Sequence, residues 1–313
     1  MRLRPIAALS AAAVTALLLA GCGAGEAEPE ATGTPADLCA AAAPAGDASD
    51  SVTVDGELGT ASEATFDAPI EPSDLEVTVV DEGEGEPVEA GEFISYAMTA
   101  YSGETGEMLA AVGYEPGELL PSQLSAETIH GQVFGCGKVG KRVVATFPAS
   151  DQSGPEVYVL DLLDTVPTAA WGAEQEPADG MPTVELAEDG APSITLPESD
   201  APTETQVSVL KKGDGYEVQE GDYALIQYIG IRWSNGETFD STWDGAAPIA
   251  YPTTQYVPGF RKALEGQTVG SQVLVVIPPA EGYGEGEINE EDLKGESLVF
   301  VVDILGGQAA PAE

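Results

Sequence analysis

Few residues of this 313-residue sequence have both the type and the setting that binding or catalysis requires. Tyr283 lies between Gly282 and Gly284, and a glycine-flanked loop is too flexible to hold a core aromatic side chain. We therefore expect Tyr283 to contact a ligand. Aromatic residues within strand patterns are usually core residues. Without further information, Tyr228, Phe239 and Phe300 would therefore be interpreted as core residues.

Three other motifs carry weaker chemical signals. His130 is the only histidine, and no nucleophile or carboxylate arrangement accompanies it. The acidic loop Glu285–Asp292 lacks the alternating Asp/Asn–Gly order of a calcium loop, so a solvated loop is expected. No helix pattern follows Gly213-Asp-Gly215, which therefore indicates a turn rather than a phosphate cradle. We predict no metal ion and no cofactor.

The elements that must position Tyr283 lie within residues 223–305. Apolar runs rich in β-branched and aromatic residues predict strands at 223–231, 273–277 and 298–305. Asn235-Gly236 favours a two-residue hairpin turn leading into a strand at 238–243. The stretch Val257–Gly266 predicts a short helix, because it has proline near its start, apolar residues at helical spacing and a glycine at its end.

The order of short motifs in this stretch resembles that of the FKBP-type peptidyl-prolyl cis-trans isomerases. The matching motifs are Tyr228-Ile-Gly, Asn235-Gly-Glu-Thr-Phe-Asp-Ser, Val257-Pro-Gly-Phe, Val269-Gly-Ser, Ile277-Pro-Pro, Gly282-Tyr-Gly and Leu298-Val-Phe. Together they cover about a hundred residues, the size of a small domain. The resemblance implies an α+β fold in which a twisted antiparallel sheet wraps around one short helix.

The resemblance also implies a prolyl pocket and assigns its residues. The pocket would be lined by Tyr228, Phe239, Val257, Phe260, Tyr283 and Phe300, with Ile249 and Tyr251 at its edge. Phe260 would form the floor. Tyr283 would hydrogen-bond a substrate carbonyl, helped by the backbone N–H of Val257. Asp240 would place its carboxylate near the twisting amide and act through its charge.

Rotation of an X–Pro amide requires no acid, base or nucleophile. Resonance holds the amide planar and creates a barrier of about 18–20 kcal/mol. A pocket that binds the twisted amide better than either planar isomer therefore accelerates the reaction. An apolar site also helps, because the twisted amide is less charge-separated than the planar one. An aromatic, dry pocket with few polar groups suits this chemistry.

Three departures from the family pattern bear on turnover rate and on macrolide affinity. Phe260 stands where the family usually has tryptophan, and Gly245 stands where an arginine commonly pairs with the aspartate. The aspartate would therefore be oriented differently or be less firmly ionised. The loop 285–295 lacks the usual His-Pro and Ile-Pro-Pro segments, which leaves Ile288 or Leu293 to cover the pocket.

The sequence contains an internal repeat at a shift of 130 positions. The shift aligns, among others, Val77 with Val207, Gly91 with Gly221, Gly140 with Gly270 and Pro148 with Pro278. It predicts two tandem FKBP-like domains at 52–167 and 182–307, with a linker at 168–181 and a tail at 308–313. Each copy has an N-terminal extension, which we expect to add a strand or to wrap the surface.

The first copy lacks the pocket residues. Opposite Tyr228, Phe239, Asp240 and Tyr283 it has Met98, Leu109, Ala110 and Ser153; opposite Phe260 it has Gln132, if a two-residue slip is allowed. The first copy is therefore predicted to be a scaffold without an isomerase site.

Residues 1–21 are predicted to be a lipoprotein signal peptide. Two arginines precede an apolar stretch that is too short to cross a bilayer comfortably, and Leu19-Ala-Gly-Cys22 resembles the bacterial lipobox. Cys22 would carry the lipid and anchor the protein to the extracytoplasmic face of the cell membrane. Residues 22–51 predict a flexible tether. In an oxidising setting a disulfide between Cys39 and Cys136 is favoured over two free thiols.

The charge of the chain excludes nucleic acid as a partner. The 54 acidic and 11 basic residues give a formal charge of −43, which repels phosphates and anionic membrane surfaces. Two functions remain open for the whole chain: an isomerase acting on secreted or envelope proteins that contain prolyl bonds, and a non-catalytic peptide-binding module. A third, a purely structural anchor protein, fits the first copy alone. The retained aromatic set favours the enzyme, and the missing arginine and tryptophan favour the binding module. No feature of the sequence indicates an oligomeric state.

Overall fold

The structure is a computed structural model that describes residues 37–151, 153–245, 247–289 and 292–311. The predicted signal peptide and Cys22 lie outside these residues. Among the described residues, no helix is long and apolar enough to span a bilayer. These residues belong to one compact unit by their contacts, so the division into two tandem domains stays a prediction.

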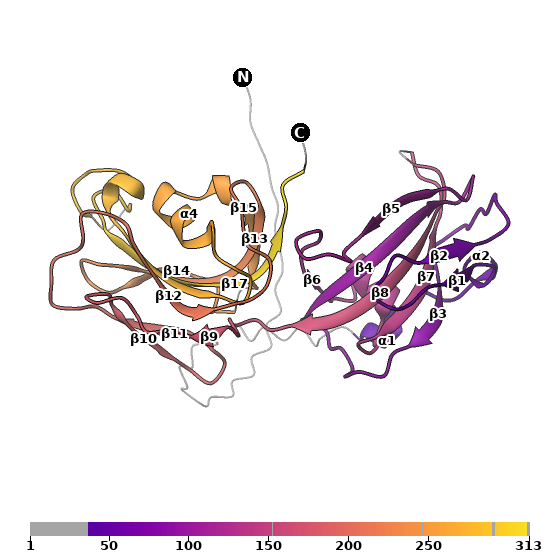
Figure 1. Ribbon diagram of the computed structural model, residues 1–313, viewed down its shortest axis with the longest axis horizontal. Coiled ribbons are helices and arrows are strands. Elements are labelled where there is room, and N and C mark those ends of the chain that lie inside the picture. Colours follow the sequence, from indigo (N-terminus) through magenta and orange to yellow (C-terminus); the bar gives the residue numbers. More distant parts are fainter. Residues whose placement is uncertain (1–36, 152, 246, 290–291, 312–313) are drawn as a thin grey trace, which may run out of the picture. The chain divides into compact units, whose positions relative to one another are not determined.

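The second half of the chain folds into an antiparallel sheet, drawn in colours from rose to yellow in Figure 1. Its strands are β9 (Ala173–Glu174), β12 (Gln206–Lys212), β13 (Tyr223–Arg232), β14 (Thr238–Ser241), β15 (Ile249–Pro252), β16 (Gln272–Ile277) and β17 (Leu298–Gln308). The order is β14-β13-β17-β16-β12-β9, and β15 also pairs with β13. The predicted strands at 223–231, 273–277 and 298–305 are confirmed. These strands lie in the middle of the sheet. They are apolar on both faces, because other elements cover both faces of the sheet.

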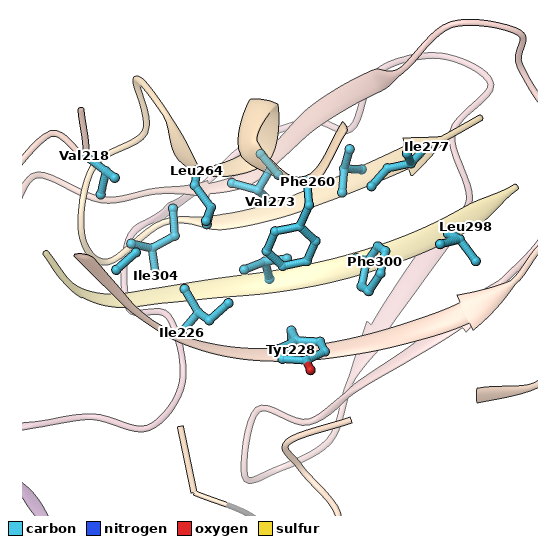
Figure 2. Close-up of a cluster of buried hydrophobic side chains, with 14 residues drawn as sticks. Val218, Ile226, Tyr228, Phe260, Leu264, Val273, Ile277, Leu298, Phe300 and Ile304 are labelled. Carbon is cyan, nitrogen blue, oxygen red and sulfur yellow. The ribbon is translucent and has the colours of Figure 1, made fainter. Parts of the chain in front are cut away.

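The helix α4 (Pro258–Leu264) covers one face of this sheet. Pro258 starts the helix at a position where its missing N–H costs nothing, and Gly266 follows the helix end with φ +79°. Figure 2 shows Phe260 and Leu264 directed from the helix toward the strands that carry Tyr228 and Phe300. The predicted helix is therefore confirmed, and it supplies the inner core. Two single-turn 3₁₀ helices, η1 (Thr253–Gln255) and η2 (Pro279–Glu281), flank the helix and β16.

A hairpin covers the opposite face of the sheet. It consists of β10 (Thr183–Leu186) and β11 (Pro192–Thr195), which pair only with each other. Val184 and Ile194 pack against the outward side chains of β16 and β17, including Leu274 and Val301. The N-terminal extension thus wraps the surface as a two-stranded unit.

The first half repeats this connectivity. Its strands are β1 (Thr53–Asp55), β2 (Glu63–Thr65), β3 (Glu76–Glu82), β4 (Phe93–Ser102), β5 (Met108–Val112), β6 (Ser122–Gln123), β7 (Lys141–Phe147) and β8 (Glu156–Val166), with helix α3 (Ile129–Phe134). The sheet order β3-β7-β8-β4-β5 matches β12-β16-β17-β13-β14, and the hairpin β1-β2 again packs on the outer face. The sequence repeat therefore corresponds to a repeat of structure.

The prediction of a flexible tether is wrong for residues 38–50. This stretch forms two short helices, α1 (Leu38–Ala41) and α2 (Asp47–Asp50). Leu38 is buried in the first core beside Phe134, and a disulfide joins Cys39 to Cys136 with 4.7 Å between the Cα atoms. The backbone N–H groups of Ala48 and Ser49 also donate to the carboxylate of Glu76. An apolar anchor, a covalent link and long-range hydrogen bonds thus order a segment whose composition is typical of a linker.

Two further predictions need correction. The stretch 168–181 is not only a linker, because β9 lies within it and pairs with the edge strand β12. The turn between β13 and β14 is longer than two residues, since Arg232 N–H donates to the carbonyl of Glu237 and Gly236 N–H to that of Arg232. The carboxylate of Glu296 accepts hydrogen bonds from the backbone and hydroxyl of Ser234 and holds the longer loop.

Candidate functional site

A cavity of about 370 Å³ lies at one end of α4 and the 3₁₀ turn η1, above strands β13, β14, β15 and β17. All nine predicted pocket residues line it: Tyr228, Phe239, Asp240, Ile249, Tyr251, Val257, Phe260, Tyr283 and Phe300. Gln255 and Tyr256 also line it and were not predicted. Residues separated by up to 72 positions in the sequence therefore meet around one apolar hollow, and Asp240 is the single charged side chain among the described residues that line it.

The floor of the cavity is Phe260, which is 4% exposed. Its ring contacts Phe300 edge-on at 4.9 Å between centroids, and Tyr228 edge-on at 6.0 Å. Figure 2 shows Phe260 coming from the helix, and Phe300 and Tyr228 from the sheet below it. Edge-to-face contacts of this kind add to the stabilisation from burial and fix the ring orientations. The floor is therefore a rigid aromatic surface.

The polar side of the cavity is a hydrogen bond between Tyr228 and Asp240. The Tyr228 hydroxyl donates to Oδ2 of Asp240 at 2.6 Å. Burial, reinforced by this carboxylate, raises the pKa of Tyr228, so the phenol keeps its proton. Among the described residues, the salt bridges are Arg142–Asp161 and Lys262–Glu281, so none of the described cations pairs with Asp240.

A β-bulge brings Phe239 and Asp240 to the same cavity although they are adjacent in sequence. Gly230 pairs with Asp240 and Ile231 pairs with Thr238, so Phe239 is the extra residue on β14. A bulge bends its strand and redirects side chains that would otherwise alternate between faces. The register of β13 and β14 therefore decides whether both residues can serve one site.

Gly230 is a positioning residue that the sequence analysis did not single out. A Cβ atom at this position would lie 2.6 Å from Cε1 of Phe300 and 2.8 Å from Cζ of Phe239. Both distances are well inside van der Waals contact, so the two rings can meet edge-on at 5.5 Å only above a glycine. A glycine inside an otherwise apolar strand is the sequence signal for such a close approach.

The rim of the cavity carries groups that can bind a peptide. Tyr283 follows η2 and is 50% exposed, beside Gly284 with φ +95°. The N–H of Val257 donates to no atom of the described residues, which leaves it available to a ligand. The predicted pocket cover is wrong for the described parts of the loop 285–295. Ile288 is exposed and Leu293 packs against the core, and neither lines the cavity.

Tyr256 extends the aromatic wall. Its ring stacks on Phe260 at 4.8 Å and lies edge-on to Tyr251 at 6.4 Å. Its hydroxyl is buried, has no hydrogen-bond partner among the described residues, and has a pKa raised by burial. A tyrosine directly before the helix N-cap, Val257, was the available signal in the sequence. The stacked pair gives the floor a larger aromatic area than Phe260 alone.

The strands of the first half align with those of the second half as predicted. In the second half Gly230 pairs with Asp240 on one side and with Phe300 on the other. In the first half Ala100 occupies the same place, and it pairs with Ala110 and with Tyr158.

The alignment of Gln132 with Phe260 is wrong. Both helices end on an equivalent hydrogen bond, from Gly135 to Gly131 in α3 and from Glu265 to Arg261 in α4. Counting back from this bond places His130 opposite Phe260, because α3 is one residue shorter at its start.

His130 occupies its position as a packed side chain. The hydrogen bond between its Nδ1 and the Ser122 hydroxyl spans 2.9 Å, and its ring lies 4.4 Å from that of Tyr96. Burial lowers the pKa of His130. In the first half, the position that corresponds to the cavity floor is therefore filled by an imidazole packed against its neighbours.

Comparisons with known proteins agree with this geometry. The family model described as FKBP-type peptidyl-prolyl cis-trans isomerase matches residues 215–305, which include every cavity residue. A probable FK506-binding protein of Corynebacterium glutamicum is 32% identical over 99 residues, covering 32% of this chain and 83% of that protein. An FK506-binding protein of Streptomyces anulatus is 31% identical over 97 residues, covering 30% of this chain and 78% of that protein.

A third relative is named for the activity itself. The peptidyl-prolyl cis-trans isomerase Mip of Coxiella burnetii is 29% identical over 100 residues, covering 32% of this chain and 43% of that protein. Matches of this extent, together with the motif order and the cavity, show that the chain belongs to the FKBP-type peptidyl-prolyl cis-trans isomerases.

Proposed function

We propose that the cavity of the second half isomerises X–Pro bonds of polypeptides outside the cytoplasmic membrane. The observation that carries this proposal is the convergence of seven aromatic rings and one carboxylate on a single cavity of about 370 Å³. Uncatalysed prolyl isomerisation takes tens of seconds or longer, so a catalyst shortens a slow step of folding. Clients would be secreted or envelope proteins that contain proline.

The aromatic floor would hold the prolyl ring. Phe260 and Tyr256 form a stacked surface, and Phe300 and Phe239 close the side. Binding a substrate here removes water from the amide, which favours the less charge-separated twisted form. The rate gain comes from binding that twisted form more tightly than the planar isomers.

Three polar groups would orient the substrate. The free N–H of Val257 and the exposed hydroxyl of Tyr283 would donate to carbonyl oxygens on either side of the proline. Asp240, held by Tyr228 at 2.6 Å, would act through its charge and not through proton transfer. No step requires a metal ion or a covalent intermediate.

The first half would serve as a non-catalytic domain. Residues 52–167 and 182–307 would be the two tandem domains, because each contains one sheet, one short helix and one hairpin. The first domain has Met98, Leu109 and Ala110 in place of the pocket residues.

Tyr283→Phe tests the assignment of the rim. The full chain should accelerate cis-trans exchange of the peptide Ala-Leu-Pro-Phe, measured by exchange NMR. The variant should lower kcat/KM about 3–10-fold, because it loses one net hydrogen bond to the substrate. Tyr223→Phe removes a hydroxyl from another exposed tyrosine, outside the cavity, and should leave the rate unchanged.

One result would overturn the proposal: a folded chain that accelerates exchange of the peptide no more than buffer does. If that chain still binds the peptide, the alternative function holds, a peptide-binding module with vestigial activity.

We also propose that a lipid on Cys22 attaches the protein to the extracytoplasmic face of the membrane. The support is the motif Leu19-Ala-Gly-Cys22 after an apolar stretch. In a bacterial host the full chain should incorporate labelled fatty acid and sediment with membranes, whereas Cys22→Ala should do neither. Label uptake by the Cys22→Ala chain would place the lipid elsewhere.

A further inference from the structure

We infer that the prolyl site selects substrates with a lysine or arginine next to the proline, and that Asp240 is the residue responsible. This inference rests on the proposed function and names a substrate class for it. Three features carry it: the isolation of the Asp240 charge in the cavity, the exposure of its carboxylate, and the pairing of the neighbouring acid Glu281.

Asp240 is the only charged side chain among the described residues that line the cavity. Its Oδ2 accepts the Tyr228 hydrogen bond, and no other hydrogen bond or ion pair involves its carboxylate among the described residues. The cavity therefore holds a negative charge that the protein leaves uncompensated.

The carboxylate is also accessible. Asp240 is exposed to solvent, while the rings around it are buried or half-buried. A peptide bound over these rings displaces water beside the carboxylate, and the attraction between opposite charges increases as water leaves. The flexible four-carbon stem of a lysine next to proline can place its ammonium near such a rim. A glutamate at the same position would be repelled.

Glu281, an acidic residue two positions before Tyr283, cannot substitute for Asp240. Glu281 lies in η2, close in sequence to Tyr283, but its Oε2 is 2.5 Å from Nζ of Lys262 and also accepts from Thr205. These interactions lower the pKa of Glu281, and its charge is already balanced by the lysine. In the first half the position of Asp240 is Ala110, so that half offers no such charge.

The formal charge of −43 would attract cationic peptides to the whole surface, so the test must separate this effect from the local one. The probes are peptides Ala-Xaa-Pro-Phe in which Xaa is lysine, N-acetyl-lysine or glutamate. Lysine and N-acetyl-lysine have nearly the same length and differ in charge. The full chain, Asp240→Asn and Glu185→Gln are compared by kcat/KM in 20 mM and in 1 M salt.

For the unmodified chain, we expect kcat/KM for lysine to exceed that for N-acetyl-lysine about fivefold at low salt, the upper range for a partly exposed ion pair. Glutamate should be poorer than N-acetyl-lysine. Asp240→Asn should bring the lysine preference close to one, whatever its effect on the absolute rate. Glu185→Gln removes one exposed charge outside the cavity and should keep the preference. High salt should reduce it, because the Debye length falls to about 3 Å.

Each alternative result has a distinct meaning. Equal rates for lysine and N-acetyl-lysine in an active chain overturn this inference and leave the proposed function standing. A lysine preference that persists in Asp240→Asn assigns it to the general surface charge and also overturns it. Absence of exchange for all three peptides contradicts the proposed function instead.

Discussion

Replacing Asp303 with asparagine is expected to stabilise the protein above pH 6, whereas the same change at Asp161 is expected to destabilise it. The two residues occupy equivalent positions on β17 and β8, and both are fully buried. They differ in the residue opposite. Asp161 faces Arg142, and Asp303 faces Gln272.

The first carboxylate is neutralised. Arg142 donates from Nε to Oδ1 of Asp161 at 2.6 Å and from Nη2 to Oδ2 at 2.8 Å, and it also donates to the carbonyls of Gly56 and Glu57. Asparagine at position 161 would leave a buried guanidinium without its counterion. Breaking one partner of a buried ion pair costs about 3–5 kcal/mol.

The second carboxylate is not neutralised. Asp303 accepts from Gln272 at 2.7 Å and from the N–H of Ala170 at 2.8 Å, which are neutral donors. Burial raises its pKa to about 6, against these hydrogen bonds and the more distant Lys211. Because the folded state holds the proton more tightly, this contribution to stability is complete below about pH 4 and is lost as pH rises through about 6.

A shift of about two pKa units corresponds to about 3 kcal/mol, which sets the upper limit for the gain in Asp303→Asn. The asparagine can accept from Ala170 and donate to Gln272 after the glutamine amide rotates. We expect a gain of about 1–3 kcal/mol in the free energy of unfolding at pH 8 and none at pH 4, measured by denaturant unfolding. A variant that is less stable than the unmodified chain at pH 8 would contradict the claim that the buried charge of Asp303 destabilises the fold.

Gly230→Ala is expected to lower kcat/KM by about 100-fold. The added methyl would overlap Phe300 and Phe239, so at least one ring must leave the cavity wall. Displacing substrate-positioning groups by about 1 Å is sufficient for a loss of this size. Overpacking also costs about 1–3 kcal/mol of stability. Exchange NMR on the Ala-Leu-Pro-Phe peptide measures the first effect, and thermal unfolding the second.

Two companion variants make the Gly230 test specific. Ala100→Gly, at the equivalent place in the first half, removes a methyl from a residue that does not line the cavity and should leave the rate unchanged. Adding Phe239→Leu to Gly230→Ala creates space and should recover part of the stability without restoring the rate. Full activity of the Gly230→Ala variant would mean that the ring pair does not position the substrate.

Local patterns predicted the central strands and the helix of the second half. The apolar runs at 223–231 and 298–305 and the helix starting at Pro258 are continuous in sequence, so periodicity and turn residues predicted them. The resemblance then named nine residues, and all nine line one cavity. One failure lies where the partners are distant: residues 38–50 are held by the buried Leu38, by the bridge to Cys136 and by hydrogen bonds to Glu76.

The sequence by itself determined most of the elements and the repeat, because each depends on spacing along the chain, and the resemblance in motif order named most of the aromatic set. The tertiary structure alone decided which neighbours face each other. The bulge at Phe239 depends on how β14 pairs with β13, and the stacking of Tyr256 on Phe260 depends on the entry of the chain into α4. The charge environment of Asp303 depends on Ala170, which is 133 residues away. Burial and electrostatics are set by such contacts in space, and single-sequence patterns do not encode them.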